Sequence, residues 1–167
     1  MKNIILCGFM GCGKTTVGHL LANRTERIFV DMDSYIETHQ QMTIRQIFND
    51  FGETYFRDLE TKAAMELSQK SDLIIAAGGG TLTIQRNVDI LKANGVIVML
   101  DTPLAAIKER LKGDTTRPLL QSDDRNAVIE ELYQKRIAAY QNAADIIIPA
   151  GAPAQAVVGL IVKSINK

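Results

Sequence analysis

Cysteine is scarce in this sequence, with only Cys7 and Cys12 among 167 residues. Two cysteines so close together form neither a disulfide framework nor a set of metal ligands. We expect Cys7 to be a small buried core residue. Cys12 precedes a predicted helix, where the pKa of a thiol can fall, but a spacer in a glycine-rich loop is the simpler interpretation.

A surplus of charge is also missing, because 19 Lys and Arg residues balance 19 Asp and Glu residues. Without a basic surplus or a Lys/Arg block, nothing points to nucleic acid or a membrane surface as a partner. Long hydrophobic runs are absent: the first apolar run is too short for a signal peptide, and no segment approaches a membrane span. We therefore expect a cytoplasmic monomer with a small-molecule substrate. A chain that is 46% hydrophobic can bury the core of one compact domain.

Short apolar, β-branched runs alternate along the chain with longer segments of helical period. Such runs are typical of parallel strands that are covered on both faces. The alternation predicts an α/β fold, a doubly wound five-stranded parallel sheet with helices on both faces. The predicted strands are Asn3–Cys7, Ile28–Asp31, Leu73–Ala77, Val96–Leu100 and Asp145–Ile148. The predicted helices are Gly13–Asn23, Asp33–His39, Thr43–Asp50, Thr54–Gln69, Ile84–Ala93, Leu104–Leu111, Arg125–Asn142 and Ala154–Ile165.

The sequence GFMGCGKT at residues 8–15 lies between the first strand and the first helix. It matches the phosphate-binding loop G-x-x-x-x-G-K-[ST] in the strand–loop–helix context that the motif requires. Glycines allow the loop to curl so that several N–H groups face one anion, and the helix N-terminus adds positive charge. Lys14 is expected on the β- and γ-phosphates and Thr15 on Mg²⁺. The candidate nucleotide-binding residues here are Gly11, Cys12, Gly13, Lys14, Thr15 and Thr16.

Two acidic residues follow the second predicted strand, in the sequence Asp31-Met32-Asp33. If the backbone stays extended there, both carboxylates point the same way. Asp31 can then hold a water on Mg²⁺, and Asp33 can accept the proton of an attacking hydroxyl. An equally good interpretation is that Asp33 caps the next helix.

Arg57 and Glu60 lie one helical turn apart and can be neighbours. They are either a surface ion pair or an arginine aimed into the cleft and oriented by Glu60 to bind a carboxylate. Gly78, Gly79 and Gly80 follow the third strand directly. Three consecutive glycines cost backbone entropy, which favours a substrate-binding wall, where a ligand approaches the main chain, over a plain loop.

Residues 112–124 form a long polar connection between two predicted helices. They are either a lid, with Arg117 meeting the phosphate charge on closure, or a surface loop, which composition alone favours. Arg136 lies within a predicted helix, and periodicity alone makes it a solvated charge.

Together, these segments resemble the shikimate kinase family over essentially the whole chain. The resemblance rests on GFMGCGKT, Asp31-x-Asp33, Phe56-Arg57-x-x-Glu60, Gly78-Gly79-Gly80, Thr116-Arg117-Pro118-Leu119-Leu120, and Arg136 before Tyr140. It implies a P-loop kinase fold similar to that of the nucleoside monophosphate kinases, as one domain over residues 1–167. Its substrate-binding region would lie at about 32–60 and its lid at about 112–124. The implied reaction transfers the γ-phosphoryl group of ATP, with Mg²⁺, to the 3-hydroxyl of shikimate.

The resemblance also implies roles for single residues. Arg57 and Arg136 would grip the shikimate carboxylate, and Asp33 would bind its hydroxyls together with the main chain around Gly79 and Gly80. Phe48 and Phe56 would line the same pocket.

On the nucleotide side, the resemblance implies that Thr15 and, through water, Asp31 hold Mg²⁺. Lys14 and the lid residue Arg117 would stabilise the transferring group. Arg110 would stack on the adenine.

The sequence departs from the family pattern at two places. Ala77 stands before the glycines where family members often have a hydroxyl residue, and residues 149–153 lack the arginine of many adenine loops. Pro153 is the residue left to pack on the base. Alternatives are another small-molecule P-loop kinase, acting on gluconate or a nucleoside monophosphate, or a nucleotide-binding switch protein. The Arg57–Glu60 pair and the triple glycine argue against the other kinases.

Overall fold

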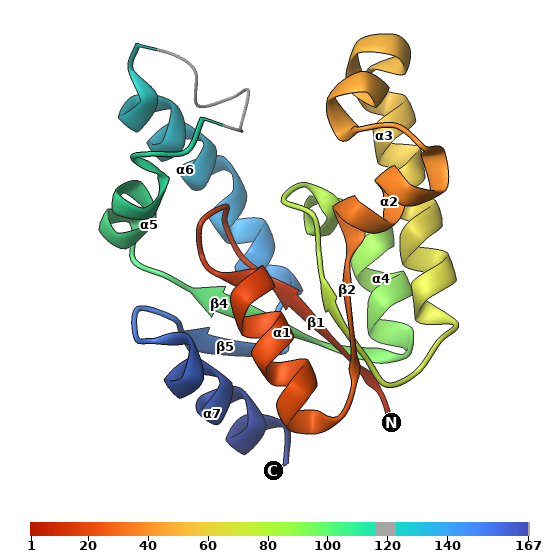
Figure 1. Cartoon of the computed structure of the whole chain (residues 1–167), viewed down its shortest axis with the longest axis vertical. Coiled ribbons are helices and arrows are strands. Elements are labelled where there is room, and N and C mark those ends of the chain that lie inside the picture. Colours follow the sequence, from red (N-terminus) through yellow and green to blue (C-terminus); the bar gives the residue numbers. More distant parts are fainter. Residues whose placement is uncertain (116–122, 167) are drawn as a thin grey trace.

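The computed structural model describes residues 1–115 and 123–166, and its centre is one parallel sheet (Figure 1). The strand order is β2-β3-β1-β4-β5, and every neighbouring pair is parallel. The strands are β1 (Asn3–Cys7), β2 (Ile28–Asp31), β3 (Leu73–Ala76), β4 (Gly95–Asp101) and β5 (Ile146–Pro149). All five predicted strands are confirmed, each to within one residue at either end.

Helices cover both faces of the sheet, because side chains along a buried strand alternate between its two faces. In β1, Ile4 and Leu6 pack into a core with α1 (Lys14–Thr25) and α7 (Ala154–Ile165). Ile5 and Cys7 pack on the opposite side with α3 (Ile44–Ser68), α4 (Gln85–Ala93) and α6 (Arg125–Ala143). The predicted three-layer α/β architecture is therefore confirmed. The described residues also form α2 (Met32–Gln40) and α5 (Leu104–Leu111).

Helix α3 consists of two helical segments that meet at a kink at Gly52, which confirms the prediction of two helices over Thr43–Asp50 and Thr54–Gln69. Thr43 starts the first segment with a capping box, in which its hydroxyl and the side chain of Gln46 satisfy each other's backbone N–H groups. Gly52 has φ 85° and ψ 176°, a backbone conformation open essentially to glycine alone. The kink brings Phe48 and Phe56, from the two segments, to a ring-centroid distance of 4.9 Å.

The topology explains where a ligand can bind. The chain passes from β1 to β2 and β3 on one side and then to β4 and β5 on the other, so the strand order reverses at β1. Ligands of such sheets bind beyond the carboxyl ends of the strands at this switch point. At this edge α2 and α3 stand on one side and α5 and α6 on the other (Figure 1). Within the described ranges, no helix has the combined length and apolarity that a membrane span requires.

Candidate active site

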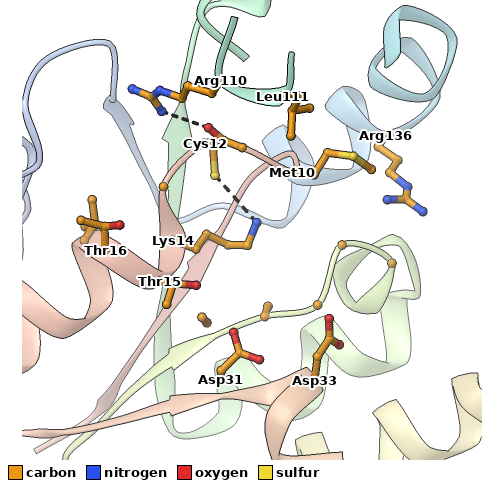
Figure 2. A pocket seen from close by; sticks show the side chains of 18 of the residues that line it. Met10, Cys12, Lys14, Thr15, Thr16, Asp31, Asp33, Arg110, Leu111 and Arg136 are labelled. Atoms are coloured by element: carbon orange, nitrogen blue, oxygen red, sulfur yellow. Dashed lines mark hydrogen bonds between the residues drawn. The ribbon is translucent and has the colours of Figure 1, made fainter. Parts of the chain in front are cut away.

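A cavity of about 610 Å³ lies at the carboxyl edge of the sheet (Figure 2). It gathers the ends of β1, β2 and β3 together with side chains from α3, α5 and α6. A single cavity therefore joins the phosphate loop to the acidic and arginine residues that the sequence analysis selected. The predicted site residues that line it are Gly11, Cys12, Gly13, Lys14, Thr15, Thr16, Asp31, Asp33, Phe48, Phe56, Arg57, Glu60, Gly78, Gly79, Gly80, Arg110 and Arg136.

The phosphate loop curls between β1 and α1 because its glycines take left-handed conformations. Gly8, Gly11 and Gly13 have φ values of 142°, 77° and 97°. Gly13 also caps α1 without any side chain, which leaves the N–H groups of the first helical turn free for an anion. The amine of Lys14 donates to the carbonyl of Gly8 at 2.7 Å. It also lies 3.8 Å from the sulfur of Cys12 (Figure 2). The loop thus has the positive, concave form of a phosphate cradle.

The acidic pair is placed differently from its predicted geometry, although both carboxylates reach the cavity. The chain turns helical at Met32, so Asp31 and Asp33 are not two residues of one extended strand. Asp31, not Asp33, is the N-cap of α2, and its Oδ1 accepts a hydrogen bond from the Ser34 N–H at 3.0 Å. The interpretation of Asp33 as the cap is therefore wrong. Its carboxylate remains available for chemistry.

Asp33 is a carboxylate in an unfavourable environment. Its burial, followed by the negative charges of Asp31 and Glu60, raises its pKa to about 6, and the positive charge of Lys14 opposes this shift. A pKa near the working pH suits a group that accepts a proton during a reaction.

The donors near the phosphate loop fit a magnesium ion that arrives with phosphate. Thr15 offers an exposed hydroxyl, and Asp31 offers a carboxylate of which the helix cap uses only one oxygen. Across residues 1–115 and 123–166, no group of three His, Cys, Asp or Glu side chains forms a metal site. Mg²⁺ needs no such cage, because it usually takes one or two protein oxygens, several waters and the oxygens of its phosphate ligand.

Arg57 and Glu60 form a partly buried pair, not a surface pair. Arg57 Nη1 donates to Glu60 Oε2 at 2.6 Å, and the Glu60 side chain is only 1% exposed. Arg57 Nη2 also donates to Glu53 at 3.2 Å. Two carboxylates thus fix one guanidinium at the wall of the cavity, which is the arrangement that the cleft interpretation predicts.

The triple glycine is explained by neighbouring side chains. None of the three has a left-handed backbone. A Cβ built on Gly78 would lie 2.9 Å from Asp33 Oδ1, and one on Gly79 would lie 2.9 Å from Arg136 Nη1. A Cβ on Gly80 would overlap the Arg57 guanidinium, with Cζ at 2.6 Å. Each glycine therefore makes room for at least one charged side chain of the cavity, a cause that backbone entropy alone does not indicate.

Arg136 lines the cavity from α6 and is not a fully solvated charge, so the interpretation from periodicity is wrong. Figure 2 shows its guanidinium on the side of the cavity near Met10 and the glycine segment. Sequence reasoning assigned no role to Tyr140 or Thr81, although both contact this wall. The available signals were the position of Tyr140 one turn after Arg136, and that of Thr81 directly after the glycines.

Of the remaining residues predicted to bind the nucleotide, one lines the cavity, one lies beside it and one lies outside the described residues. Arg110 lines the cavity and donates to the carbonyl of Gly11 at 3.0 Å. Pro153 is exposed and stands just before α7, but the cavity is lined by its neighbours Ala152 and Ala154. Arg117 and most of the predicted lid lie outside the described residues.

Comparisons with known proteins converge on one family. A family model described as shikimate kinase matches residues 10–166. A shikimate kinase of Persephonella marina is 43% identical over 86% of this chain and 86% of its own length. A shikimate kinase of Thermodesulfovibrio yellowstonii is 42% identical over 100% of this chain and 96% of its own. The solved structure of shikimate kinase from Acinetobacter baumannii in complex with shikimate superposes with a TM-score of 0.93 at 36% identity, covering 99% of this chain and 93% of that one.

Proposed function

Since this chain belongs to the shikimate kinase family, we propose that its cavity holds ATP and shikimate side by side for phosphoryl transfer. The reaction moves the γ-phosphoryl group of ATP to the 3-hydroxyl of shikimate and yields shikimate 3-phosphate and ADP. One observation carries the assignment of residues: Arg57, Arg136 and Asp33 line the same cavity as Lys14 and Thr15. A binding site for a small hydroxy acid thus adjoins a triphosphate cradle.

The phosphate loop binds the triphosphate. Its N–H groups and the N-terminus of α1 receive the phosphate oxygens, and Lys14 exchanges the Gly8 carbonyl for the β- and γ-phosphates. Thr15 and, through water, Asp31 would hold Mg²⁺, which when bound would neutralise charge on the phosphate oxygens. Arg110 and the segment around Pro153 lie on the adenine side.

The acceptor binds on the opposite side of the cavity. Arg57 and Arg136 bind the carboxylate of shikimate, since planar guanidinium groups match a carboxylate bidentately. Phe48 and Phe56 cover the apolar part of the ring, and the main chain of Gly78, Gly79 and Gly80 faces its hydroxyls. Glu60, which also lines the cavity, belongs to this substrate-binding side and holds Arg57 in place.

Asp33 accepts the proton of the 3-hydroxyl as its oxygen attacks the γ-phosphorus. The new O–P bond forms while the bond between the γ-phosphorus and the bridging β–γ oxygen breaks, and ADP leaves with that electron pair. Lys14 stabilises the charge on the transferring group. By resemblance, Arg117, which lies outside the described residues, does the same from the lid at about 112–124. Within the region at about 32–60 of this single domain, the residues that line the cavity are the ones that face the substrate.

We also place the protein in the cytoplasm as a monomer with no nucleic acid or membrane partner. The two free, buried cysteines support a reducing compartment. The zero net charge supports the absence of a polyanionic partner.

Arg57 provides the test of this function. The purified protein is assayed for ADP release with shikimate, gluconate and a nucleoside monophosphate as acceptors, with ATP and Mg²⁺. We expect release with shikimate, and the Arg57→Ala variant should lose roughly 30-fold or more in kcat/KM for shikimate, because a partly buried charge-assisted contact contributes about 2–5 kcal/mol. The matched control is Arg45→Ala, the same change at an exposed position of α3 outside the cavity.

Three outcomes would contradict the proposal. ADP release with another acceptor but not with shikimate assigns a different kinase. Nucleotide binding without any acceptor-dependent release indicates a switch protein. Equal effects of Arg57→Ala and Arg45→Ala show that the Arg57 guanidinium does not bind the acceptor.

A further inference from the structure

The segment Gly78–Thr81 lies between Arg57 and Arg136. It is hydrogen-bonded to Glu60, which binds Arg57, and to Tyr140, which lies one turn after Arg136. Arg136 approaches Gly79 from α6, and Arg57 approaches Gly80 from α3, so closely that neither glycine has room for a Cβ. The spacing of the two guanidinium groups therefore depends on how this segment is held. Two buried hydroxyl groups outside the cavity hold it, one from each side.

Tyr140 holds the segment from the α6 side. It is 1% exposed, and its hydroxyl donates to the carbonyl of Gly79 at 2.6 Å. Burial raises the pKa of Tyr140 to about 12, so the hydroxyl keeps its proton as a donor at neutral pH. Arg136 lies one turn earlier on the same helix, and its guanidinium packs against Gly79 as well. The hydrogen bond to the Gly79 carbonyl thus fixes the distance between α6 and the segment Gly78–Thr81.

Thr81 holds the segment from the α3 side. It is fully buried, and its Oγ1 donates to Glu60 Oε1 at 2.8 Å. The other oxygen, Glu60 Oε2, accepts from Arg57 Nη1. One buried carboxylate therefore binds both the segment Gly78–Thr81 and Arg57. The carbonyl of Thr81 accepts from Asn87 Nδ2 at 2.9 Å, which anchors the turn to α4.

Both hydroxyls act at a distance from a ligand. Neither Tyr140 nor Thr81 lines the cavity, whereas Arg57, Arg136 and Glu60 do. Arginine side chains have many rotamers, and two of them must meet the two sides of one carboxylate at a fixed separation. A shared, rigid backbone segment against which both guanidinium groups pack supplies that separation.

We propose that Tyr140 and Thr81 are positioning residues that set the spacing of Arg136 and Arg57 for an acidic substrate. The proposal rests on the proposed function, in which these arginines bind the carboxylate of shikimate. It assigns the discrimination of a charged acceptor from a neutral one to two residues that never touch that acceptor.

The test uses Tyr140→Phe and Thr81→Val, two nearly isosteric changes that each remove one hydroxyl. The KM for shikimate and for its uncharged methyl ester is measured by ADP release, and shikimate binding by calorimetry. We expect the KM and Kd for shikimate to rise about tenfold in each variant, the size that the loss of one buried hydrogen bond produces. The KM for the ester and for ATP should change less than about twofold, so the preference for the acid falls by the same factor of about ten.

Two controls separate positioning from a merely structural role. Tyr35→Phe removes a tyrosine hydroxyl that donates to Glu66 at 2.8 Å, away from the active-site cavity, and should leave the preference for the acid unchanged. Thr81→Ser keeps the hydroxyl and should restore the wild-type preference. Thermal unfolding of every variant shows which ones fold, and if one of the two test variants does not, the other decides.

A variant that folds and keeps the wild-type ratio of shikimate to ester overturns the proposal. So does a variant in which shikimate, ester and ATP are affected equally, because that result indicates a general loss of structure. If the proposed function itself fails, the wild-type protein releases no ADP with shikimate, which is distinct from an active wild type with unaffected variants.

Discussion

Replacing Gly80 by alanine should impair shikimate binding while leaving the backbone unstrained. Gly80 has φ −99° and ψ −11°, a conformation that alanine adopts readily. The added methyl group would nevertheless overlap the Arg57 guanidinium, whose Cζ is 2.6 Å from the built Cβ. Since the guanidinium is the far end of a flexible side chain, it is the group that moves.

The cost of that movement follows from the contacts of Arg57. It must leave Glu60, which it binds at 2.6 Å and whose side chain is 1% exposed. Once displaced, Arg57 no longer reaches the carboxylate of shikimate. A charge-assisted hydrogen bond of this kind contributes about 1.5–3 kcal/mol, so the Kd for shikimate should weaken about 10- to 150-fold. The loss in folding free energy should be smaller, about 1–2 kcal/mol, because alanine recovers about 0.4–1 kcal/mol from the unfolded chain and Thr81 still bonds the second Glu60 oxygen.

Calorimetry with shikimate and with ADP–Mg²⁺ measures the effect, and we expect unchanged nucleotide binding. Gly159→Ala is the matched control. Gly159 lies in the middle of α7, and the nearest atom to its built Cβ outside that helix is Arg24 Nη1 at 4.0 Å. It should stabilise the protein by about 0.5–1 kcal/mol without changing shikimate binding.

A double-mutant cycle tests whether the methyl group of Gly80→Ala acts on shikimate binding through Arg57. In an Arg57→Ala background, Gly80→Ala should weaken shikimate binding no further, because nothing remains for the methyl group to displace. Additive effects of the two changes, or a Gly80→Ala variant that binds shikimate like the wild type, would show that the overlap does not control Arg57.

Two further predictions concern groups that face the reacting phosphate. Because burial and its acidic neighbours raise the pKa of Asp33 from 3.8 to about 6, kcat/KM for shikimate should fall below about pH 6 as this carboxylate is protonated, and Asp33→Asn should be nearly inactive at every pH. A raised carboxyl pKa means that the folded state binds the proton more tightly than the unfolded state, so this group lowers the free energy of unfolding as the pH rises from about 4 to 6. Asp33→Asn should therefore be more stable than the wild type at pH 7, by up to about 3 kcal/mol. Urea unfolding should show that this advantage is lost near pH 4. A wild-type acid limb near pH 4, or an Asp33→Asn variant that is less stable at pH 7, would refute this. For Lys14→Met we expect kcat to fall about 10²–10³-fold, the usual cost of one lost transition-state contact, while calorimetric shikimate binding stays within about twofold; a parallel loss of shikimate binding would place Lys14 on the acceptor instead.

Local pattern was sufficient for most of the secondary structure and for half of the cavity. The strands were predictable because each is a short apolar, β-branched run between helical patterns, and α5 and α7 because their apolar residues repeat with a helical period. The phosphate loop was predictable because its function depends on backbone N–H groups, glycine dihedrals and one lysine within a short segment. Its left-handed glycines and the position of Lys14 in the cavity follow that expectation.

Prediction failed where a residue's role depends on a distant partner. The cap of α2 is Asp31 and not Asp33, because α2 begins at Met32, one residue earlier than the pattern indicated. Periodicity misplaced Arg136 because a helix next to a ligand cavity turns a charged face inward, and only the packing of α6 decides which face that is. Tyr140 and Thr81 gave only the weak signal of their positions beside Arg136 and the glycines, because their partners, Gly79 and Glu60, are remote along the chain.

The amino-acid sequence by itself determined the order of elements, the phosphate cradle and the edge of the sheet at which a ligand binds, since these depend on periods and dihedrals within a few residues. Only the tertiary structure decided which charged side chains occupy the space beside Gly78, Gly79 and Gly80. Those contacts join β3, α2, α3 and α6, and their geometry is set when the helices pack onto the sheet. The phosphate half of the site is therefore a local property of the chain, and the acceptor half is a property of the packed fold.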